Sequence, residues 1–188
     1  VAARNNVRKI NLESIGVEVP QDLTINPEAV FSFFSGETKL VAARYPNNTT
    51  VGMGNVIDKG PVTRGGGAGV DDGRGFEFEM IDDRPLNWKN TDDIWMHGAF
   101  YEEWEVGDYR IRTINKDTQS IRTYDHCRYG AEYKKNNNHY YYNILEELDT
   151  PGEYVIDRIN GILYYYLMSS NPETELVSVA TKKDTFFT

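Results

Sequence analysis

Short runs of alternating apolar and polar residues recur along the whole chain, and residues that favour turns separate them. Alternation with a period of two is typical of strands that bury one face. Only residues 144–148 and a turn near residue 88 carry a helical signal. We therefore predict an all-β fold, an antiparallel β-sandwich or open barrel of about ten strands. The runs that predict these strands cover residues 7–19, 30–34, 39–44, 76–80, 92–95, 99–106, 108–114, 120–124, 154–157, 162–166 and 176–180.

Two turns predict hairpins within this fold. Asn160-Gly161 lies between two of the alternating runs, and this dipeptide tolerates the positive φ angles of a tight type I′ turn. Residues 35–38 form a second turn, and the strand that follows should end at Pro46. Proline has no amide hydrogen, so it does not continue a central strand.

One long stretch without a strand pattern covers residues 58–75, which are rich in Gly and Asp. We predict a mobile loop there, loosest at Gly65–Gly69. These glycines lack the Lys-Ser/Thr pair of a phosphate-binding loop and do not join a clear strand to a helix, so a flexible connector is the simpler interpretation. The chain has 188 residues, a length that suits one core, and we predict a single β-sandwich domain over residues 1–188.

The composition excludes several classes of function. The formal net charge is −9, the pI is near 4.9 and no cluster of Lys and Arg exceeds a pair, so nucleic acid is not an expected partner. No apolar run approaches the roughly 18 residues that a membrane span requires. Cys127 is the single cysteine, which rules out an intramolecular disulfide and a cysteine-rich zinc site within the chain. We expect no cofactor and no bound metal.

Histidines and carboxylates are the candidates for catalysis. No metal motif fits the spacing of the three histidines, which are His97, His126 and His139. His126 adjoins Cys127, but neighbours in a strand point to opposite faces, so the two are poorly placed to act as base and nucleophile. Glycoside hydrolysis needs two carboxylates about 5 to 10 Å apart, which sequence spacing does not reveal. We therefore assign no catalytic residue from the sequence.

Aromatic residues make up 13% of the chain and offer a different kind of site. Exposed Trp and Tyr rings stack on flat partners, including the apolar faces of sugars. Trp95 and Trp104 suit the sandwich core, whereas Trp88 has polar neighbours and is the least core-like tryptophan. The candidate carbohydrate-binding residues are therefore Trp88, Tyr140, Tyr141 and Tyr142.

Four segments resemble the motifs of a known family. They are Leu-Val-Ala-Ala-Arg-Tyr-Pro-Asn at residues 40–47, Asp-Ile-Trp-Met-His-Gly at 93–98, Leu-Glu-Glu-Leu-Asp-Thr-Pro-Gly-Glu-Tyr at 145–154 and Asp-Arg-Ile-Asn-Gly-Ile-Leu-Tyr-Tyr-Tyr at 157–166. In the family, the motifs run as Ala-Arg-Trp-Pro-Asn, then Trp-x-His-Gly, then Leu-Glu-Glu-Leu-Asp-x-Pro-Gly-Glu-Trp-Tyr leading to Gly-x-Leu-Tyr. Over roughly residues 36–180, the chain resembles the β-sandwich domain of large bacterial right-handed parallel β-helix proteins, including the glycoside hydrolase family 141 group.

The resemblance implies that this domain is an excised piece of a larger bacterial protein, secreted or on the cell surface, with the β-helix of the same parent chain as its partner. It also implies structural roles for the motif residues. Among them, Arg44 would pair with a carboxylate, and a Pro-Gly pair would set a corner. The motif residues are Arg44, Pro46, Trp95, His97, Gly98, Pro151, Gly152, Asn160 and Gly161.

Three functions stay open at this point. The resemblance favours a non-catalytic accessory β-sandwich of a polysaccharide-active, glycoside hydrolase-like protein, whose catalytic carboxylates would lie largely on the β-helix. The alternative is an autonomous carbohydrate-binding module with an aromatic platform. The third is a small glycosidase that uses Glu102 or Glu146.

Overall fold

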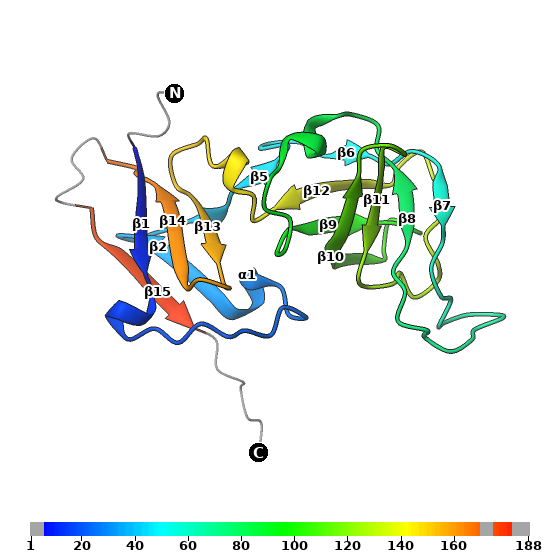
Figure 1. The fold of residues 1–188 in the computed structure, drawn as a ribbon, viewed down its shortest axis with the longest axis horizontal. Coiled ribbons are helices and arrows are strands. Elements are labelled where there is room, and N and C mark those ends of the chain that lie inside the picture. The colour runs from blue at the N-terminus through cyan, green and yellow to red at the C-terminus, as the bar shows by residue number, and fades with distance from the viewer. Residues whose placement is uncertain (1–5, 170–174, 182–188) are drawn as a thin grey trace, which may run out of the picture. The chain divides into compact units, whose positions relative to one another are not determined.

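A computed structural model describes residues 6–169 and 175–181 of the chain. Within these ranges the chain forms fifteen strands, one short α-helix and three 3₁₀ helices (Figure 1). The all-β class is confirmed, with more and shorter strands than the alternation predicts. No helix in the described ranges is long and apolar enough to cross a membrane. The elements are β1 (Val7–Asn11), η2 (Glu13–Ile15), α1 (Pro27–Val30), β2 (Phe31–Ser35), β3 (Thr38–Lys39), β4 (Val41–Ala42), β5 (Arg44–Tyr45), β6 (Val51–Gly52), β7 (Val56–Asp58), β8 (Glu77–Glu79), η3 (Arg84–Asn87), β9 (Trp95–Ala99), β10 (Val106–Asn115), β11 (Ser120–Thr123), β12 (Asn138–Tyr142), η4 (Leu145–Glu147), β13 (Glu153–Asp157), β14 (Ile162–Tyr166) and β15 (Val177–Thr181).

Two compact units share the chain. Unit 1 comprises Val1–Ala43 and Asn143–Thr188, and unit 2 comprises Arg44–Tyr142. Each unit buries its own set of apolar side chains, so each is described by itself. The prediction of one domain over the whole chain stays a prediction.

Unit 1 is a sandwich of two sheets. One sheet has the order β1-β14-β13-β4, in which only the short β13–β4 pair is parallel, and the other has the order β15-β2-β3. Phe33 of β2 meets Tyr154 of β13 edge to face, with 4.7 Å between ring centroids, so the inner faces of the two sheets are in contact. Both rings are buried, and each contributes about 2 kcal/mol by leaving water.

The hairpin of β13 and β14 exists, but its turn differs from the predicted one. The register ends at the pair Asp157 and Ile162, which leaves a loop of four residues, 158–161. Gly161 has a φ of +66°, whereas Asn160 does not have a positive φ, so the type I′ turn is wrong. Four-residue loops are built most often around a type I turn. Here the Asp157 carboxylate accepts a hydrogen bond from the Asn160 amide at 3.0 Å and holds that longer loop.

The predicted helical turn before this hairpin is present as η4, and a Pro-Gly corner follows it. Gly152 has a φ of +89°, which favours glycine. Glu153 is buried next to this corner, and its carboxylate accepts hydrogen bonds from the amides of Asp149 at 3.1 Å and Thr150 at 2.9 Å. Burial nevertheless raises the pKa of Glu153 to about 7, because desolvation of the carboxylate outweighs these two hydrogen bonds.

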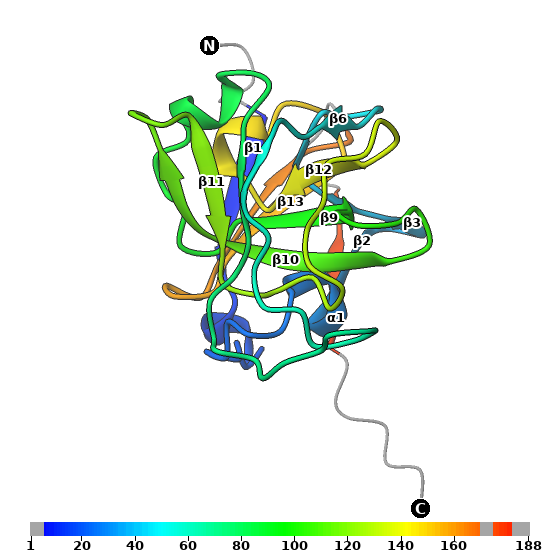
Figure 2. The ribbon, with the colours of Figure 1, turned by 90° about the vertical axis from the view of Figure 1, so that its right-hand side faces the viewer.

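Unit 2 is a single antiparallel sheet that curls on itself. Its strands follow the order β5-β12-β9-β10-β11-β8-β7, and β6 pairs with β12. Figure 2 shows β6, β12, β9 and β10 one below the other. Only residues 53–55 separate β6 from β7, and within them the Gly54 amide donates to the carbonyl of Glu79 in β8 at 2.9 Å. One short segment therefore bonds to β12 at one end of the strand order and to β8 near the other, so the sheet approaches a closed barrel.

Five rings fill the interior of this curled sheet, and we call them the aromatic core: Phe76, Phe78, Phe100, Tyr109 and His139. Their contacting pairs have ring centroids 4.8 to 6.0 Å apart. Burial lowers the pKa of His139 to about 3, so the imidazole is neutral at ordinary pH and packs as an aromatic ring.

The predicted strand over residues 99–106 is wrong in its centre. Residues 100–105 form the loop between β9 and β10, and within it the Glu105 amide donates to the Glu102 carbonyl at 2.9 Å. Phe100 enters the aromatic core and the carboxylate of Glu105 is also buried, so the two ends of the loop turn inward. The alternation of aromatic and acidic residues at this position therefore belongs to a turn and does not indicate a strand.

The predicted loop at residues 58–75 contains no strand between the end of β7 at Asp58 and the start of β8 at Glu77. Part of it is tied down, because the amides of Thr63 and Arg64 both donate to the carbonyl of Arg128, at 2.8 and 3.0 Å. The mobility of this loop stays a prediction.

Substitution of Gly98 in β9 tests how closely β9 and β12 approach each other. A Cβ atom at this position would lie 2.5 Å from the Asn138 carbonyl oxygen and 2.7 Å from the Cα of His139, so alanine would force the strands apart. We expect Gly98→Ala to lower the free energy of unfolding by about 2 kcal/mol or more, measured by chemical denaturation. Gly66→Ala is the control, because a Cβ there meets nothing within 4 Å. Equal stability of the two variants would contradict the close approach.

Glu153 makes the stability of the chain depend on pH. Its folded-state pKa of about 7 lies above the ordinary 4.5, so the native state binds this proton more tightly than the unfolded state does. The stabilisation is complete below the unfolded pKa and is lost as pH rises through the folded pKa. Relative to Glu153→Gln, the wild type should lose about 1 to 3 kcal/mol of unfolding free energy between these two values. Parallel stability curves for the two proteins from pH 4.5 to 8 would refute this assignment.

Candidate functional site

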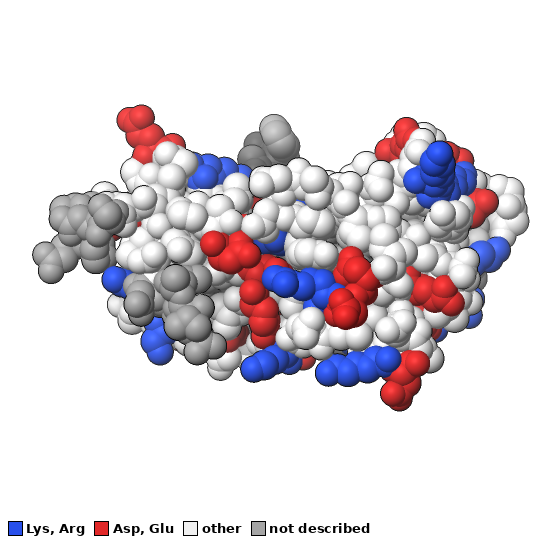
Figure 3. Space-filling model, turned by 90° about the horizontal axis from the view of Figure 1, so that it is seen from above, with Lys and Arg blue, Asp and Glu red and all other residues white. Residues whose placement is uncertain are grey.

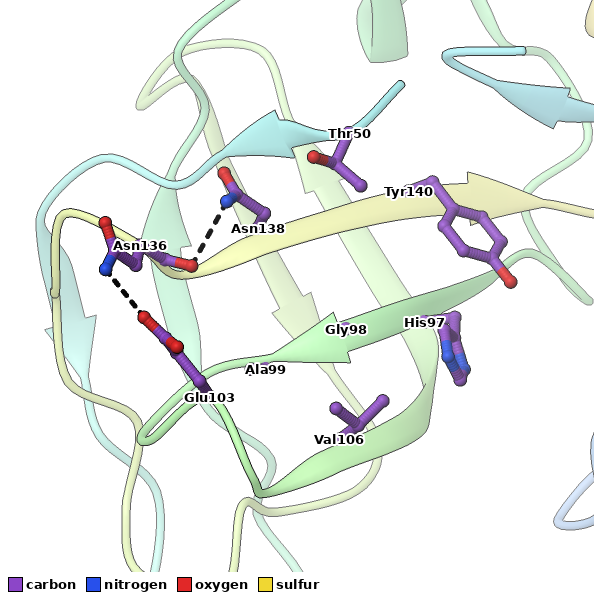
Figure 4. Close-up of a pocket in the computed structure, with 9 residues that line it drawn as sticks. All are labelled: Thr50, His97, Gly98, Ala99, Glu103, Val106, Asn136, Asn138 and Tyr140. Carbon is purple, nitrogen blue, oxygen red and sulfur yellow. Dashed lines mark hydrogen bonds between the residues drawn. The ribbon is translucent and has the colours of Figure 1, made fainter. Parts of the chain in front are cut away.

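An open groove of about 510 Å³ lies on unit 2, along β12, β9 and the start of β10 (Figure 4). Six of its nine lining residues carry a hydroxyl, amide, imidazole or carboxylate group, and these groups place donors and acceptors along an open surface. The lining residues are Thr50, His97, Gly98, Ala99, Glu103, Val106, Asn136, Asn138 and Tyr140. Its polar lining and open shape suit a hydrogen-bonding ligand better than an apolar one.

His97 is held at one end of this groove by a carboxylate on the next strand. His97 and Asp108 are paired across β9 and β10, and the imidazole Nδ1 lies 3.0 Å from the Asp108 Oδ1. The Tyr142 hydroxyl donates to the same oxygen at 2.9 Å. Asp108 therefore fixes the orientation of both the ring and the hydroxyl. The sequence does not reveal this cluster, because it depends on the register of three strands.

Tyr140 lies beside His97 (Figure 4). Arg44 covers one face of the Tyr140 ring. The guanidinium carbon of Arg44 is 3.5 Å from the Tyr140 ring centroid. The same guanidinium donates to the carbonyls of Pro46 at 2.9 Å and Thr49 at 2.8 Å. The expected pairing of Arg44 with a carboxylate is therefore wrong, because the turn after β5 presents backbone carbonyls to it instead. Of the four candidate carbohydrate-binding residues that the sequence predicts, Tyr140 alone is half-buried.

The other three candidate carbohydrate-binding residues are buried. Trp88 is 6% exposed, and its ring meets those of Tyr45 and Tyr141. Tyr141 and Tyr142 are 2% and 1% exposed. The expectation that Trp88 is the least core-like tryptophan is wrong. At the end of η3 the Trp88 ring turns inward, while its polar neighbours in the sequence face solvent. Buried rings leave no open face for a sugar, so the exposure assumed for these three residues is absent.

The other two tryptophans differ from each other. Trp95 is buried, as expected, and its indole Nε1 donates to the Asp93 carboxylate at 2.8 Å. Trp104 is 65% exposed, so its placement in the core is wrong. Its acidic neighbours in Glu-Glu-Trp-Glu are a signal that could have indicated a solvent-facing turn.

Cys127 is not placed to act as a nucleophile. The thiol is buried and donates to the carboxylate of Glu105 at 3.1 Å. Burial raises the pKa of Cys127 to about 12, so the reactive thiolate is essentially absent at ordinary pH. This agrees with the sequence-based interpretation of the His126-Cys127 pair as unsuitable for catalysis.

His126 instead joins a hydroxyl and a carboxylate from the loop at residues 58–75. Its Nε2 lies 2.9 Å from the Thr63 hydroxyl, and its Nδ1 lies 3.4 Å from the Asp71 carboxylate. The order resembles a hydrolytic triad, but the amides of Thr63 and Arg64 both donate to a backbone carbonyl, so neither supplies an oxyanion hole. We interpret the cluster as an anchor for the loop.

The carboxylates considered for a small glycosidase lie in different units. Glu102 of unit 2 is ion-paired with Lys134, and Glu146 of unit 1 is exposed on η4. Among the described residues, no three His, Cys, Asp or Glu side chains converge in the manner of a metal site.

Comparison with known proteins indicates a fold relationship. No family model matches the chain, and no curated protein matches it. Among solved structures, a chain described as a glycoside hydrolase matches with a TM-score of 0.53 and 18% sequence identity. The match covers 79% of this chain and 26% of that chain, so this chain spans about a quarter of the length of the matched protein. At this identity, the likeness shows a glycoside-hydrolase-related fold alone.

Arg44 tests whether the motif residues hold the fold. Arg44→Ala removes two hydrogen bonds to carbonyls and the cover over Tyr140, so it should lower the free energy of unfolding by about 1 to 3 kcal/mol. Arg64→Ala removes an exposed arginine of the same charge and should change stability by less than about 0.5 kcal/mol. If thermal denaturation gave both variants the melting temperature of the wild type, the structural role of Arg44 would be wrong.

Proposed function

We propose that this chain is a non-catalytic accessory β-sandwich of a polysaccharide-active, glycoside hydrolase-like β-helix protein. The observation that carries the proposal is that its motif residues are engaged in contacts within the domain itself. Apart from His97, which also lines the groove, the motif residues described above serve packing and turns and so specify a scaffold, and the fold relationship with a glycoside hydrolase gives that scaffold a carbohydrate context.

The contacts of the motif residues support this role. Trp95 is buried and bonded to Asp93, and Arg44 holds the turn after β5. Gly98 permits the close approach of β9 to β12, and Gly152 supplies a positive φ at the corner before β13. Residues with such roles maintain shape and do not carry chemistry.

The surface fits a carbohydrate partner better than a polyanion. The net charge is −9, and on the face shown in Figure 3 the Lys and Arg side chains lie among Asp and Glu side chains. The groove offers side chains that form hydrogen bonds with hydroxyl groups, such as Glu103 and Asn136. In the proposed parent protein, the catalytic carboxylates lie on the β-helix of the same chain. The parent protein is secreted or stands on the cell surface.

A second candidate function is an autonomous carbohydrate-binding module. It is favoured by one observation, the ring of Trp104 in the loop at residues 100–105, which is 65% exposed. This candidate differs from the first in that the chain would serve as an independent binding module, without the β-helix of a parent protein as its partner.

Hydrolysis by the purified chain tests the proposal. Incubation with a panel of plant and host polysaccharides should release no reducing sugar over the buffer background, because the proposed catalytic groups belong to another part of the parent protein. A commercial glycoside hydrolase on each polysaccharide is the positive control. Release by the chain that Glu102→Gln abolishes would overturn the proposal and favour the small glycosidase. A parent gene without parallel β-helix repeats beside this segment would also contradict it.

A further inference from the structure

Three aromatic rings form an exposed cluster on unit 2, apart from the residues that line the groove. The rings of Tyr101 and Tyr129 are stacked, with centroids 5.3 Å apart and an interplanar angle of 11°. Trp104 stands nearly perpendicular to Tyr129, with centroids also 5.3 Å apart and an angle of 85°. We call these three rings the platform. The two tyrosines are half-buried, whereas Trp104 is 65% exposed, so a large indole surface faces solvent.

Buried groups hold the platform in place. Phe100, at the start of the loop, is anchored in the aromatic core, and Glu105, at its end, is buried. The Glu105 carboxylate accepts from the Cys127 thiol at 3.1 Å and from the Arg128 Nε at 3.4 Å. The loop that carries Tyr101 and Trp104 is thus joined to the segment that carries Tyr129. A site held in this way loses little conformational entropy when a ligand binds.

Packing alone does not account for the exposure of Trp104. The hydrophobic effect favours burial of an indole ring. Trp104 nevertheless makes only an edge contact with Tyr129, which leaves most of its ring exposed. An indole left mostly open beside two ordered rings is a surface for a flat, partly apolar ligand. The C–H faces of pyranose rings have this character, and their hydroxyl groups require polar partners at the edge.

The charges around the platform favour an uncharged ligand. The ammonium group of Lys134 lies 4.4 Å from the Tyr101 ring centroid and is paired with Glu102 and Glu132. Arg128 is paired with Glu105. Both cations next to the rings are therefore balanced by carboxylates, and the chain as a whole is acidic, so an anionic glycan gains no attraction here.

From these observations we infer that Tyr101, Trp104 and Tyr129 form a binding platform for a pyranose unit of a neutral polysaccharide. This inference rests on the carbohydrate-related role proposed above. The loop that carries two of the rings also contributes Glu103, which is hydrogen-bonded to Asn136 at 2.6 Å in the groove (Figure 4). One polar group of the groove, the Glu103 carboxylate, thus belongs to the same loop as two of the rings.

Binding of soluble polysaccharides tests the platform. The intact chain is titrated by calorimetry and by affinity electrophoresis with neutral xyloglucan, mixed-linkage β-glucan, galactomannan and arabinoxylan, and with anionic polygalacturonate for comparison. We expect the wild type to bind at least one of the neutral polysaccharides. Trp104→Ala should weaken that binding at least tenfold, because it removes the largest open ring.

Tyr124→Ala is the matched control. Tyr124 is 43% exposed, and its ring is stacked by Arg110, not by the rings of the platform. This variant should bind as the wild type does. The melting temperature of Trp104→Ala should stay within a few degrees of the wild type, because the removed ring is mostly exposed. If this variant unfolds, Trp104→Phe serves instead, and it should retain an intermediate affinity.

Three results would overturn the proposal that the platform binds a neutral polysaccharide. They are the absence of binding to all four neutral polysaccharides, equal affinity of the wild type and Trp104→Ala, and binding to polygalacturonate alone. None of these bears on sugar release, so the platform can fail while the accessory role stands. Conversely, release of reducing sugar would overturn the accessory role, whereas the loss of affinity in Trp104→Ala would still support the platform.

Discussion

The packing of five rings inside unit 2 is the constraint on which the rest of this unit depends. Phe76, directly before β8, and Tyr109 of β10 both meet Phe100, and Phe78 and His139 come from strands that are not neighbours in the sheet. Rings from such distant strands make contact only if the sheet curls. His139 takes part as a neutral ring, because burial lowers its pKa to about 3. One hydrophobic cluster thus determines the curvature of the sheet and the positions of its loops.

The exposed features of unit 2 follow from this buried cluster. Because Phe100 is fixed in the aromatic core, the chain must turn immediately after it, and the buried carboxylate of Glu105 brings the chain back into β10. Only the middle of the loop reaches solvent, which places Trp104 outside. The groove depends on the same strands, since its imidazole is oriented by Asp108 across the β9–β10 pair. In the proposed account, the core supplies rigidity and the loop supplies contact with carbohydrate.

Local patterns in the sequence predict much of the fold but little of the site. Alternation correctly indicates β2, β8, β11 and the β13–β14 hairpin, and in β2, β8 and β14 it follows one buried face, whereas β13 is buried on both faces. It fails at Trp88, whose ring turns inward among polar neighbours, and at residues 99–106, where a turn imitates a strand. The Asn-Gly dipeptide marks a hairpin but not its loop length, which Asp157 sets through its bond to Asn160. The His97–Asp108 pair and the stacked platform depend on register and on contacts far apart in the chain, for which the sequence has no local signal.

The measurement that tests this account most directly is amide chemical-shift mapping of the isotope-labelled chain, titrated with a neutral oligosaccharide from the polysaccharide that binds best. The account predicts perturbations concentrated at residues 100–105 and 127–130, extending to groove residues such as His97 and Asn136, and unchanged signals for the buried motif residues of unit 1. Perturbations that avoid the loop of Trp104 and gather in unit 1 would contradict it.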